Sequence, residues 1–280
     1  VQNPTVRILE DKIAALEHGC GALALASGMA AASTAVFSTI KAGSHVVCLK
    51  NAYGPLKDLL TGYCREHMNV ETTFVKGVEV SEFEAVITDK TDLVVLESTS
   101  SLVFSLQDIR RVSEIAHAHQ AKVYIDNTYC TPLYQKPLDM GADIVMHTTS
   151  KYIGGHSDVI GGMLVTKDQE LFAKLLHNRE LFGGIVGPME AWLMIRGLRT
   201  MAARLEQHQK TAMEVAKFLE EQPMVEKVYY PGLPSHPQYE LMKQQQTGNC
   251  GLLSFELKGT LEQAVKFAES LKIFKIGVSW

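Results

Sequence analysis

The sequence lacks a surplus of basic residues and any long apolar run. Lys and Arg total 27 against 31 Asp and Glu, which gives a formal net charge of −4 at pH 7. Proteins that bind nucleic acid or anionic membranes electrostatically usually carry excess positive charge, so we expect neither partner. No apolar stretch approaches the roughly 20 residues that a transmembrane helix needs. No secretory signal pattern is visible at the start.

Paired cysteines and the usual spacing of metal ligands are also missing. The 5 cysteines are odd in number and form no CxxC motif, which disfavours a disulfide framework and predicts a reducing, cytoplasmic location. The 10 histidines show no HExxH or comparable pattern, so we predict no metal site. The run Thr148–Lys151 partly matches the Ser-x-x-Lys motif of penicillin-binding enzymes, but the serine is replaced and the partner motifs are absent.

What the sequence does have is an alternation of buried-type strands and helical patterns. A first helix is expected after Asn3-Pro4, where a capping residue precedes proline at the first helical position. Further helices are expected at 28–40, 56–67 and 107–119. Strands are expected at 22–26, 45–49, 70–75, 92–97, 121–126 and 143–151. This alternation predicts an α/β fold with a mostly parallel sheet covered on both faces.

The pattern changes after Gly155. One more strand, at 161–165, is expected to return to the sheet, followed by a mainly helical stretch at 169–221 that glycines interrupt at 183–184 and 187. The remaining chain predicts the order β, β, α, β at 225–230, 251–257, 261–271 and 273–278. We therefore predict a large domain over residues 1–200 and a smaller α+β domain over residues 201–280.

Two polar residues end neighbouring apolar strands. Asp126 ends the run that begins at Ala121, and Lys151 ends the run that begins at Asp143. Open α/β sheets keep their ligand sites at the carboxyl ends of the strands. A lysine amine can form a Schiff base, and an aspartate can hold a protonated pyridine nitrogen. These are the protein groups that pyridoxal phosphate chemistry needs most.

The helix expected to start near Gly28 could bind a phosphate. Residues 26–32 are small enough to let an anion approach the backbone N–H groups, and a helix amino end carries unpaired donors and partial positive charge. The same residues are equally compatible with close helix packing. Thr148 and Ser150 could donate hydroxyls to this phosphate or could simply cap a turn. Their place beside a lysine at a sheet edge favours the ligand.

Lys151 and Tyr53 are the candidate reactive side chains. Lys151 precedes a glycine turn at 154–155, and an apolar environment would lower its pKa and free the amine as a nucleophile. Tyr53 lies in a turn after a strand, where its ring could stack on a pyridine and its phenol could act as acid or base. A lone tyrosine in a turn is more often a packing residue, so Tyr53 gains weight only from its neighbours.

These segments together resemble a known family, the pyridoxal-phosphate enzymes of cysteine and methionine metabolism. Its members include cystathionine γ-synthase, cystathionine β- and γ-lyases, methionine γ-lyase and homoserine sulfhydrylases. The matching segments follow the family order along the whole chain: Asn3-Pro4-Thr5, Leu9-Glu10, Ala26-Ser27-Gly28-Met29, Tyr53-Gly54, Asp126-Asn127-Thr128, Ser150-Lys151-Tyr152, Gly154-Gly155-His156-Ser157-Asp158, Arg196-Gly197-Leu198-Arg199-Thr200, Tyr230-Pro231-Gly232-Leu233 and His236-Pro237.

The resemblance implies the fold-type I pyridoxal-phosphate transferase fold and a set of residue roles. Lys151 would hold the cofactor covalently and shuttle protons, and Asp126 would keep the ring nitrogen protonated. The phosphate would be bound by the backbone of Gly28 and Met29 and by the hydroxyls of Thr148 and Ser150.

The resemblance also implies residues for the ring and the substrate. Tyr53 would stack on the ring and assist proton transfer, and Ser279 would help to bind the substrate carboxylate. Ser101-Leu102 stands where many members have asparagine and proline. Ser101 is therefore a candidate substrate contact of shorter reach.

Two family features are not present in the sequence. The family commonly has a tyrosine and an arginine just before the position of Val1, donated to a neighbouring subunit's phosphate, and an arginine after the position of Trp280 that clamps the substrate. We expect the chain to be a truncated piece of a longer protein. We also expect a homodimer or homotetramer with shared active sites.

The reaction implied by the resemblance is carbon–sulfur bond cleavage. We expect α,β- or α,γ-elimination from cystathionine, methionine, cysteine or homocysteine. Val278 stands where several γ-synthases and cystathionine γ-lyases carry glutamate, and Pro55 stands where methionine γ-lyases carry cysteine. A γ-replacement enzyme, such as cystathionine γ-synthase or an O-acylhomoserine sulfhydrylase, is the alternative. A non-catalytic member of the fold is a remote alternative.

Overall fold

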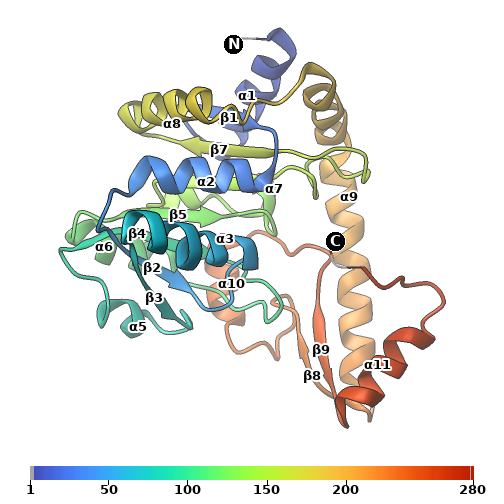
Figure 1. Ribbon diagram of the computed structural model, residues 1–280. Coiled ribbons are helices and arrows are strands. Elements are labelled where there is room, and N and C mark those ends of the chain that lie inside the picture. Colours follow the sequence, from blue (N-terminus) through green and yellow to red (C-terminus); the bar gives the residue numbers. More distant parts are fainter. Residues whose placement is uncertain (1–2, 278) are drawn as a thin grey trace.

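The computed structural model describes residues 3–277 and 279–280, and its main feature is a seven-stranded sheet (Figure 1). The strand order across the sheet is β1-β7-β6-β5-β4-β2-β3. The strands are β1 (Gly21–Leu25), β2 (His45–Leu49), β3 (Glu71–Val75), β4 (Thr91–Glu97), β5 (Lys122–Asp126), β6 (Ile144–Thr148) and β7 (Gly162–Thr166).

The pairing within this sheet confirms the predicted mostly parallel architecture. The pairs β2–β3, β2–β4, β4–β5 and β5–β6 are parallel, whereas β7 runs antiparallel to both β1 and β6. The central strands consist of nearly unbroken apolar residues because both of their faces are covered, and residues Leu93 to Leu96 of β4 are all buried.

Helices cover both faces of the sheet. Right-handed crossovers that run in opposite directions along a sheet lie on opposite faces. The connections β1-to-β2 and β2-to-β3 therefore place α2 (Gly28–Thr39) and α3 (Gly54–Asp58) on one face, where α8 (Gln169–Phe182) also contacts α2. The connections β3-to-β4 and β4-to-β5 place α5 (Val80–Glu84) and α6 (Ile109–Ala118) on the other. There, α1 (Pro4–Glu17) contacts the short helix α7 (Thr131–Tyr134).

Several helix boundaries follow the predicted local signals. Asn3 caps α1 by accepting a hydrogen bond from the Thr5 N–H, and Pro4 is its first helical residue. Gly183 ends α8 in the left-handed conformation, at φ 71°, and this confirms the predicted interruption. The expected helix at 56–67 is observed as helical turns in sequence: α3, a π-helical segment η1 (Leu59–Cys64) and α4 (Arg65–Met68).

The chain after the sheet is arranged around one long helix, α9 (Pro188–Glu220), as Figure 1 shows. Strands β8 (Val225–Tyr229) and β9 (Ser254–Leu257) form a separate antiparallel pair, and the helices α10 (Tyr239–Gln245) and α11 (Leu261–Ser270) complete this part of the chain. The short helix η2 (Pro137–Met140) lies earlier, between β5 and β6. The predicted domain division at residue 200 falls inside α9 and stays a prediction.

The strand predicted at 273–278 is wrong over residues 273–277. Ile273 is 88 % exposed and Ile276 is 75 % exposed, and no described strand lies alongside them to provide hydrogen bonds. Val278 lies outside the described residues. Elsewhere in the described chain, no helix combines the length and apolar character needed to cross a membrane.

Candidate active site

The carboxyl ends of β5 and β6 bring two predicted site residues, Asp126 and Thr148, to one edge and one face of the sheet. Asp126 is the register partner of Glu97 on β4 and of Met146 on β6. Register partners project to the same face, and so does Thr148, two residues beyond Met146. This is the face that α2 covers. Asp126, Thr148 and the start of α2 are therefore neighbours, as the sequence predicted for a site at the strand ends.

Hydrogen bonds to neighbouring backbone groups fix the Asp126 carboxylate. Its Oδ1 atom accepts from the Thr128 N–H at 2.9 Å, and the Thr128 hydroxyl in turn accepts from the Thr148 N–H at 2.8 Å. Burial raises the pKa of the Asp126 carboxyl, while the Thr128 hydrogen bonds and the charge of His147 oppose this shift. A cation beside the carboxylate, such as a protonated ring nitrogen, would favour its charged form.

The amino end of α2 presents free donors beside Thr148. Ser27 caps the helix by accepting from the Ala30 N–H at 3.0 Å. The N–H groups of Gly28 and Met29 have no hydrogen-bond partner within the described part of the chain. A Cβ atom on Gly28 would lie 2.3 Å from the Thr148 Oγ1, so only glycine lets the helix approach this hydroxyl. The arrangement can hold an anion.

Lys151 lines a cavity of about 250 Å³. Its Nζ atom donates to the backbone carbonyl of Trp280 at 2.6 Å and contacts the hydroxyl of Ser279, and it lies 5.0 Å from the centre of the Trp280 ring. Partial burial lowers the pKa of the Lys151 amine. The structure thus brings Lys151 and Ser279 together, although 128 positions separate them in the sequence.

The remaining predicted residues, Ser150, Tyr53 and Ser101, make contacts that do not by themselves indicate a catalytic or binding role. The Ser150 hydroxyl accepts a hydrogen bond from the Gly161 N–H at 3.1 Å, one residue before β7. Tyr53 precedes α3 with its side chain 47 % exposed, and its N–H donates to the Glu97 carboxyl at 2.7 Å. The Ser101 hydroxyl also donates to Glu97. The roles of Ser150, Tyr53 and Ser101 stay predictions, and Glu97 emerges as an unpredicted link between two of them.

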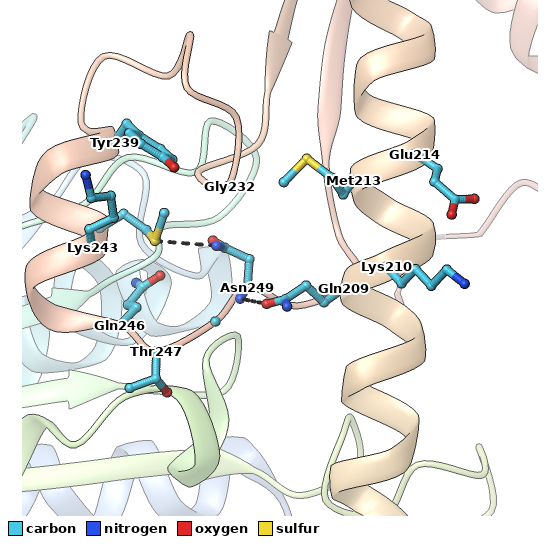
Figure 2. Close-up of a pocket in the computed structure, with 12 residues that line it drawn as sticks. Gln209, Lys210, Met213, Glu214, Gly232, Tyr239, Lys243, Gln246, Thr247 and Asn249 are labelled. Carbon is cyan, nitrogen blue, oxygen red and sulfur yellow. Dashed lines mark hydrogen bonds between the residues drawn. The ribbon is translucent and has the colours of Figure 1, made fainter.

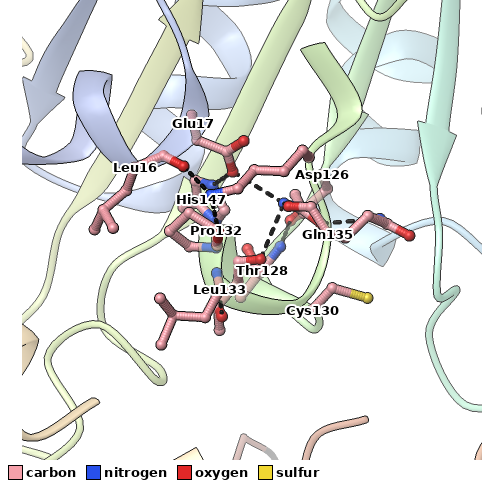
Figure 3. Close-up of polar contacts among 12 residues, drawn as sticks. Leu16, Glu17, Asp126, Thr128, Cys130, Pro132, Leu133, Gln135 and His147 are labelled. Carbon is pink, nitrogen blue, oxygen red and sulfur yellow. Dashed lines mark hydrogen bonds and ion pairs between the residues drawn. The ribbon is translucent and has the colours of Figure 1, made fainter. Parts of the chain in front are cut away.

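A buried polar network supports the strand ends from the other face (Figure 3). The His147 Nε2 atom lies 2.6 Å from the Glu17 Oε1 atom, and both side chains are almost completely buried. The Asn127 amide donates to the same Glu17 oxygen at 3.0 Å, and the Gln135 amide donates to the Asn127 Oδ1 at 2.9 Å. This network, which the sequence did not reveal, anchors the turn after Asp126 to the end of α1.

Removing one partner of the buried Glu17–His147 pair should destabilise the fold. Glu17→Ala is expected to lower the free energy of unfolding by about 3 kcal/mol because it leaves a buried imidazole without its partner. The control is Asp11→Ala, which breaks an exposed pair with Arg7 and should cost less than about 1 kcal/mol. Urea unfolding of the two variants measures both losses in the free energy of unfolding. Equal losses in the two variants would show that the network is not structural.

A second cavity, of about 510 Å³, lies between α9 and α10 and contains none of the predicted site residues (Figure 2). Its polar lining groups bind one another: the Gln209 carbonyl accepts from the Asn249 N–H at 2.5 Å, and the Asn249 amide contacts the Met242 sulfur at 3.4 Å. Its size alone does not identify a ligand, and the cavity that contains predicted site residues is the one at Lys151.

Comparisons with known proteins agree with this geometry. All 280 residues match the family described as Cys/Met metabolism PLP-dependent enzyme. The chain belongs to this family. It is 39 % identical to a cystathionine gamma-lyase of Dictyostelium discoideum, over 99 % of the chain and 71 % of that protein. It is 42 % identical to an L-methionine gamma-lyase of Porphyromonas gingivalis, over 99 % of the chain and 70 % of that protein.

Solved structures give the same result. The chain matches a cystathionine gamma synthase of Xanthomonas oryzae, determined in complex with aminoacrylate and cysteine, with a TM-score of 0.95 and 35 % identity. The match covers 99 % of the chain and 72 % of that protein. The predicted fold-type I architecture is confirmed, and this chain is a pyridoxal-phosphate enzyme.

The residues of this Cys/Met metabolism enzyme fit its cofactor. Two backbone N–H groups without partners and the partly exposed Thr148 hydroxyl suit a phosphate, and Asp126 suits a protonated ring nitrogen. Lys151 supplies a half-buried amine with a lowered pKa. The described residues contain no group of three His, Cys, Asp or Glu side chains that could hold a metal ion.

The fit predicts that Gly28 cannot be enlarged. Gly28→Ala is expected to weaken the binding of pyridoxal phosphate by about tenfold or more because its Cβ overlaps the Thr148 hydroxyl, and overpacking typically costs about 1–3 kcal/mol. The control Gly62→Ala has no atom within 4 Å of its Cβ and should bind normally. Cofactor titration by absorbance measures both affinities. Unchanged affinity in Gly28→Ala would remove this helix end from the phosphate site.

Proposed function

We propose that this protein is a carbon–sulfur lyase that acts on sulfur-containing amino acids by α,β- or α,γ-elimination. The observation that supports the proposal most strongly is the pairing of Lys151 with Ser279 at the cavity on the Asp126 edge of the sheet. An amine of lowered pKa can remove and return protons there. The neighbouring Ser279 hydroxyl can donate a hydrogen bond to a substrate, and the cavity of about 250 Å³ has room for a small amino acid.

Bound pyridoxal phosphate supplies an electron sink that stabilises negative charge on the substrate Cα atom. Lys151 would hold the cofactor and move protons at Cα and at the leaving group. Asp126 would keep the proton on the ring nitrogen, and the Tyr53 phenol would assist proton transfer.

Six further groups would bind and orient the cofactor and the substrate. The N–H groups of Gly28 and Met29 and the hydroxyls of Thr148 and Ser150 would hold the phosphate through uncharged donors. Beside Lys151, the Ser279 hydroxyl would bind the substrate carboxylate, with Ser101 as a further contact.

The choice of reaction depends on where protons move after the Cα proton has left. The relatives named above as a cystathionine gamma-lyase and an L-methionine gamma-lyase support elimination. The chain is 42 % identical to the second, although it has Pro55 where methionine γ-lyases carry cysteine. A γ-replacement reaction is the second candidate because a cystathionine gamma synthase shares the fold at a TM-score of 0.95.

Product analysis separates these reactions. Cystathionine or methionine incubated with the loaded enzyme should release pyruvate or 2-ketobutyrate, and the ratio of the two reports β- against γ-elimination. Formation of a new thioether from an activated homoserine and cysteine, without keto acid, would favour replacement. A protein that binds no cofactor and releases neither product would be a non-catalytic member of the fold.

We also propose that two copies of the chain share their active sites, as a homodimer or within a homotetramer. No Lys or Arg side chain of the described residues bonds to the phosphate-binding groups at Gly28, Met29, Thr148 or Ser150. A phosphate dianion held without a cation is costly to bury. Arg204 lines the Lys151 cavity, but its guanidinium donates to the Tyr152 and Gly197 carbonyls. A neighbouring subunit would therefore complete the charge balance.

An exposed apolar surface beside the phosphate site supports this assembly. The loop between α8 and α9 contacts the start of α2, since the Gly184 carbonyl accepts from the Ala26 N–H at 2.9 Å. Exposed apolar side chains flank this loop, and monomers seldom leave such patches open. They are Leu181, Phe182, Met189 and Trp192, each more than half exposed.

The assembly is tested by charge substitutions on this surface. Trp192→Asp with Met189→Asp should shift the sedimentation coefficient to that of a monomer and weaken cofactor binding together. Phe218→Asp, on the distant end of α9 and 60 % exposed, is the control and should change neither. A monomeric protein that still binds the cofactor tightly would rule out shared sites.

We further propose a cytoplasmic location. All five cysteines are free, and Cys48, Cys64, Cys130 and Cys250 are buried, which suits a reducing compartment. Cell fractionation tests this: recovery in a secreted fraction would contradict it.

A further inference from the structure

Glu97 lies where three segments of the active site meet. It ends β4 with only 9 % of its surface exposed, and its register partner on β5 is Asp126. Its carboxyl accepts from the Tyr53 N–H at 2.7 Å, and both the hydroxyl and the backbone N–H of Ser101 donate to it. One side chain therefore connects the Tyr53 turn, the Ser101 loop and the strand end that carries Asp126.

The surroundings of Glu97 oppose a second negative charge. Tyr124 lies on the same face two residues before Asp126, fully buried, and its hydroxyl has no partner among the described residues. The buried Cys48 thiol lies on the same face of β2. No Lys or Arg side chain of the described residues bonds to either carboxyl group. Two carboxylates on adjacent strands without a cation cannot both ionise cheaply.

The two carboxyl groups differ in what stabilises their charge. Burial raises the pKa of Glu97 most, the charge of Asp126 raises it further, and the donors at Tyr53 and Ser101 only partly oppose this. Asp126 keeps the Thr128 hydrogen bonds and the nearby His147, and it faces the ring nitrogen in the proposed site. The proton of the pair therefore belongs on Glu97 and the negative charge on Asp126.

We propose that Glu97 is a positioning residue that holds the Tyr53 turn and the Ser101 loop as an uncharged carboxylic acid, leaving the negative charge of the pair on Asp126. The idea deepens the proposed function and rests on it for the roles of Tyr53 and Asp126. It makes Glu97 necessary for its hydrogen-bonding oxygen and dispensable for its charge.

Three substitutions in the cofactor-loaded enzyme separate the oxygen from the charge. Glu97→Gln keeps a carbonyl that accepts from the Tyr53 N–H, so turnover and cofactor affinity should stay within about threefold of the wild type. Glu97→Leu leaves that buried donor unpaired and should weaken both by about tenfold or more. Glu97→Asp is too short to reach the Tyr53 N–H and should resemble Glu97→Leu.

Two readouts do not depend on activity. Hydrogen exchange of the peptide that contains Tyr53 should accelerate in Glu97→Leu and Glu97→Asp but stay slow in Glu97→Gln. The infrared spectrum at neutral pH should contain a protonated-carboxyl band that disappears in Glu97→Gln. A Glu97→Gln enzyme as impaired as Glu97→Leu, or a wild-type spectrum without the band, would overturn the uncharged role. Unchanged exchange in Glu97→Leu would overturn the positioning role.

These outcomes are distinguishable from failure of the proposed function. If the wild-type protein binds pyridoxal phosphate but releases no keto acid, the lyase reaction is wrong while the exchange and infrared results still report on Glu97. If the wild-type protein releases keto acid and all three variants match it in turnover and exchange, the lyase proposal stands and the Glu97 proposal fails.

Discussion

Replacing Lys151 with alanine is expected to reduce keto-acid release by at least about a thousandfold. The substitution removes the amine that would both hold the cofactor and move protons at the substrate, and the loss of a covalent catalytic group is rarely compensated. Steady-state product release measures the effect, and the visible absorbance of the bound cofactor should change with it. The control Lys41→Ala removes a lysine that is 79 % exposed and should leave both signals unchanged.

Lys151→Arg tests whether charge alone suffices at this position. A guanidinium remains protonated throughout the accessible pH range and cannot act as a nucleophile or base, so this variant should be as inactive as Lys151→Ala. Activity within tenfold of the wild type in either variant would mean that another group carries the chemistry.

The second large effect is expected from Asp126→Asn. A neutral amide cannot stabilise a protonated ring nitrogen, so the bound cofactor would lose most of its capacity to stabilise negative charge at the substrate Cα atom. We expect kcat/KM to fall about a hundredfold, which corresponds to about 3 kcal/mol of transition-state stabilisation. Turnover at different substrate concentrations gives both kinetic constants.

The fold should tolerate this substitution. The asparagine carbonyl can still accept from the Thr128 N–H, and burial already disfavours the charged form of Asp126. The midpoint of urea unfolding should therefore shift little, in contrast to Glu17→Ala. An Asp126→Asn enzyme with near-normal turnover would show that the ring nitrogen is not held by Asp126. If Asp126→Asn unfolds, the kinetic constants of Asp126→Glu are measured instead.

The sequence was sufficient for most of the sheet because its strands, apart from β3, are short apolar runs of a length that fits the observed elements. Strands that are buried on both faces need no alternation of polar residues, and β5 and β6 both show this pattern. The position of Asp126 and Lys151 also followed from the sequence, since polar residues that end such runs lie at the carboxyl edge of the sheet.

Contacts between distant segments could not be read in the same way. Glu17 and His147 are separated by 130 positions, and either one alone resembles an ordinary helix or strand residue. Glu97 appeared only as the last residue of a strand, although an acidic residue at the end of a strand beside that of Asp126 was a usable signal. The strand expected at 273–278 shows the converse, because an apolar run does not form a strand without a neighbour to pair with.

The most direct test is to locate the covalent attachment of the cofactor. The protein is loaded with pyridoxal phosphate, reduced with borohydride, digested and analysed by mass spectrometry. We expect the pyridoxyl group on the peptide that contains Lys151, at near-stoichiometric yield and absent from Lys151→Ala. A pyridoxyl group on any other lysine, or no modification of a protein that still binds the cofactor, would contradict the assignment of this site.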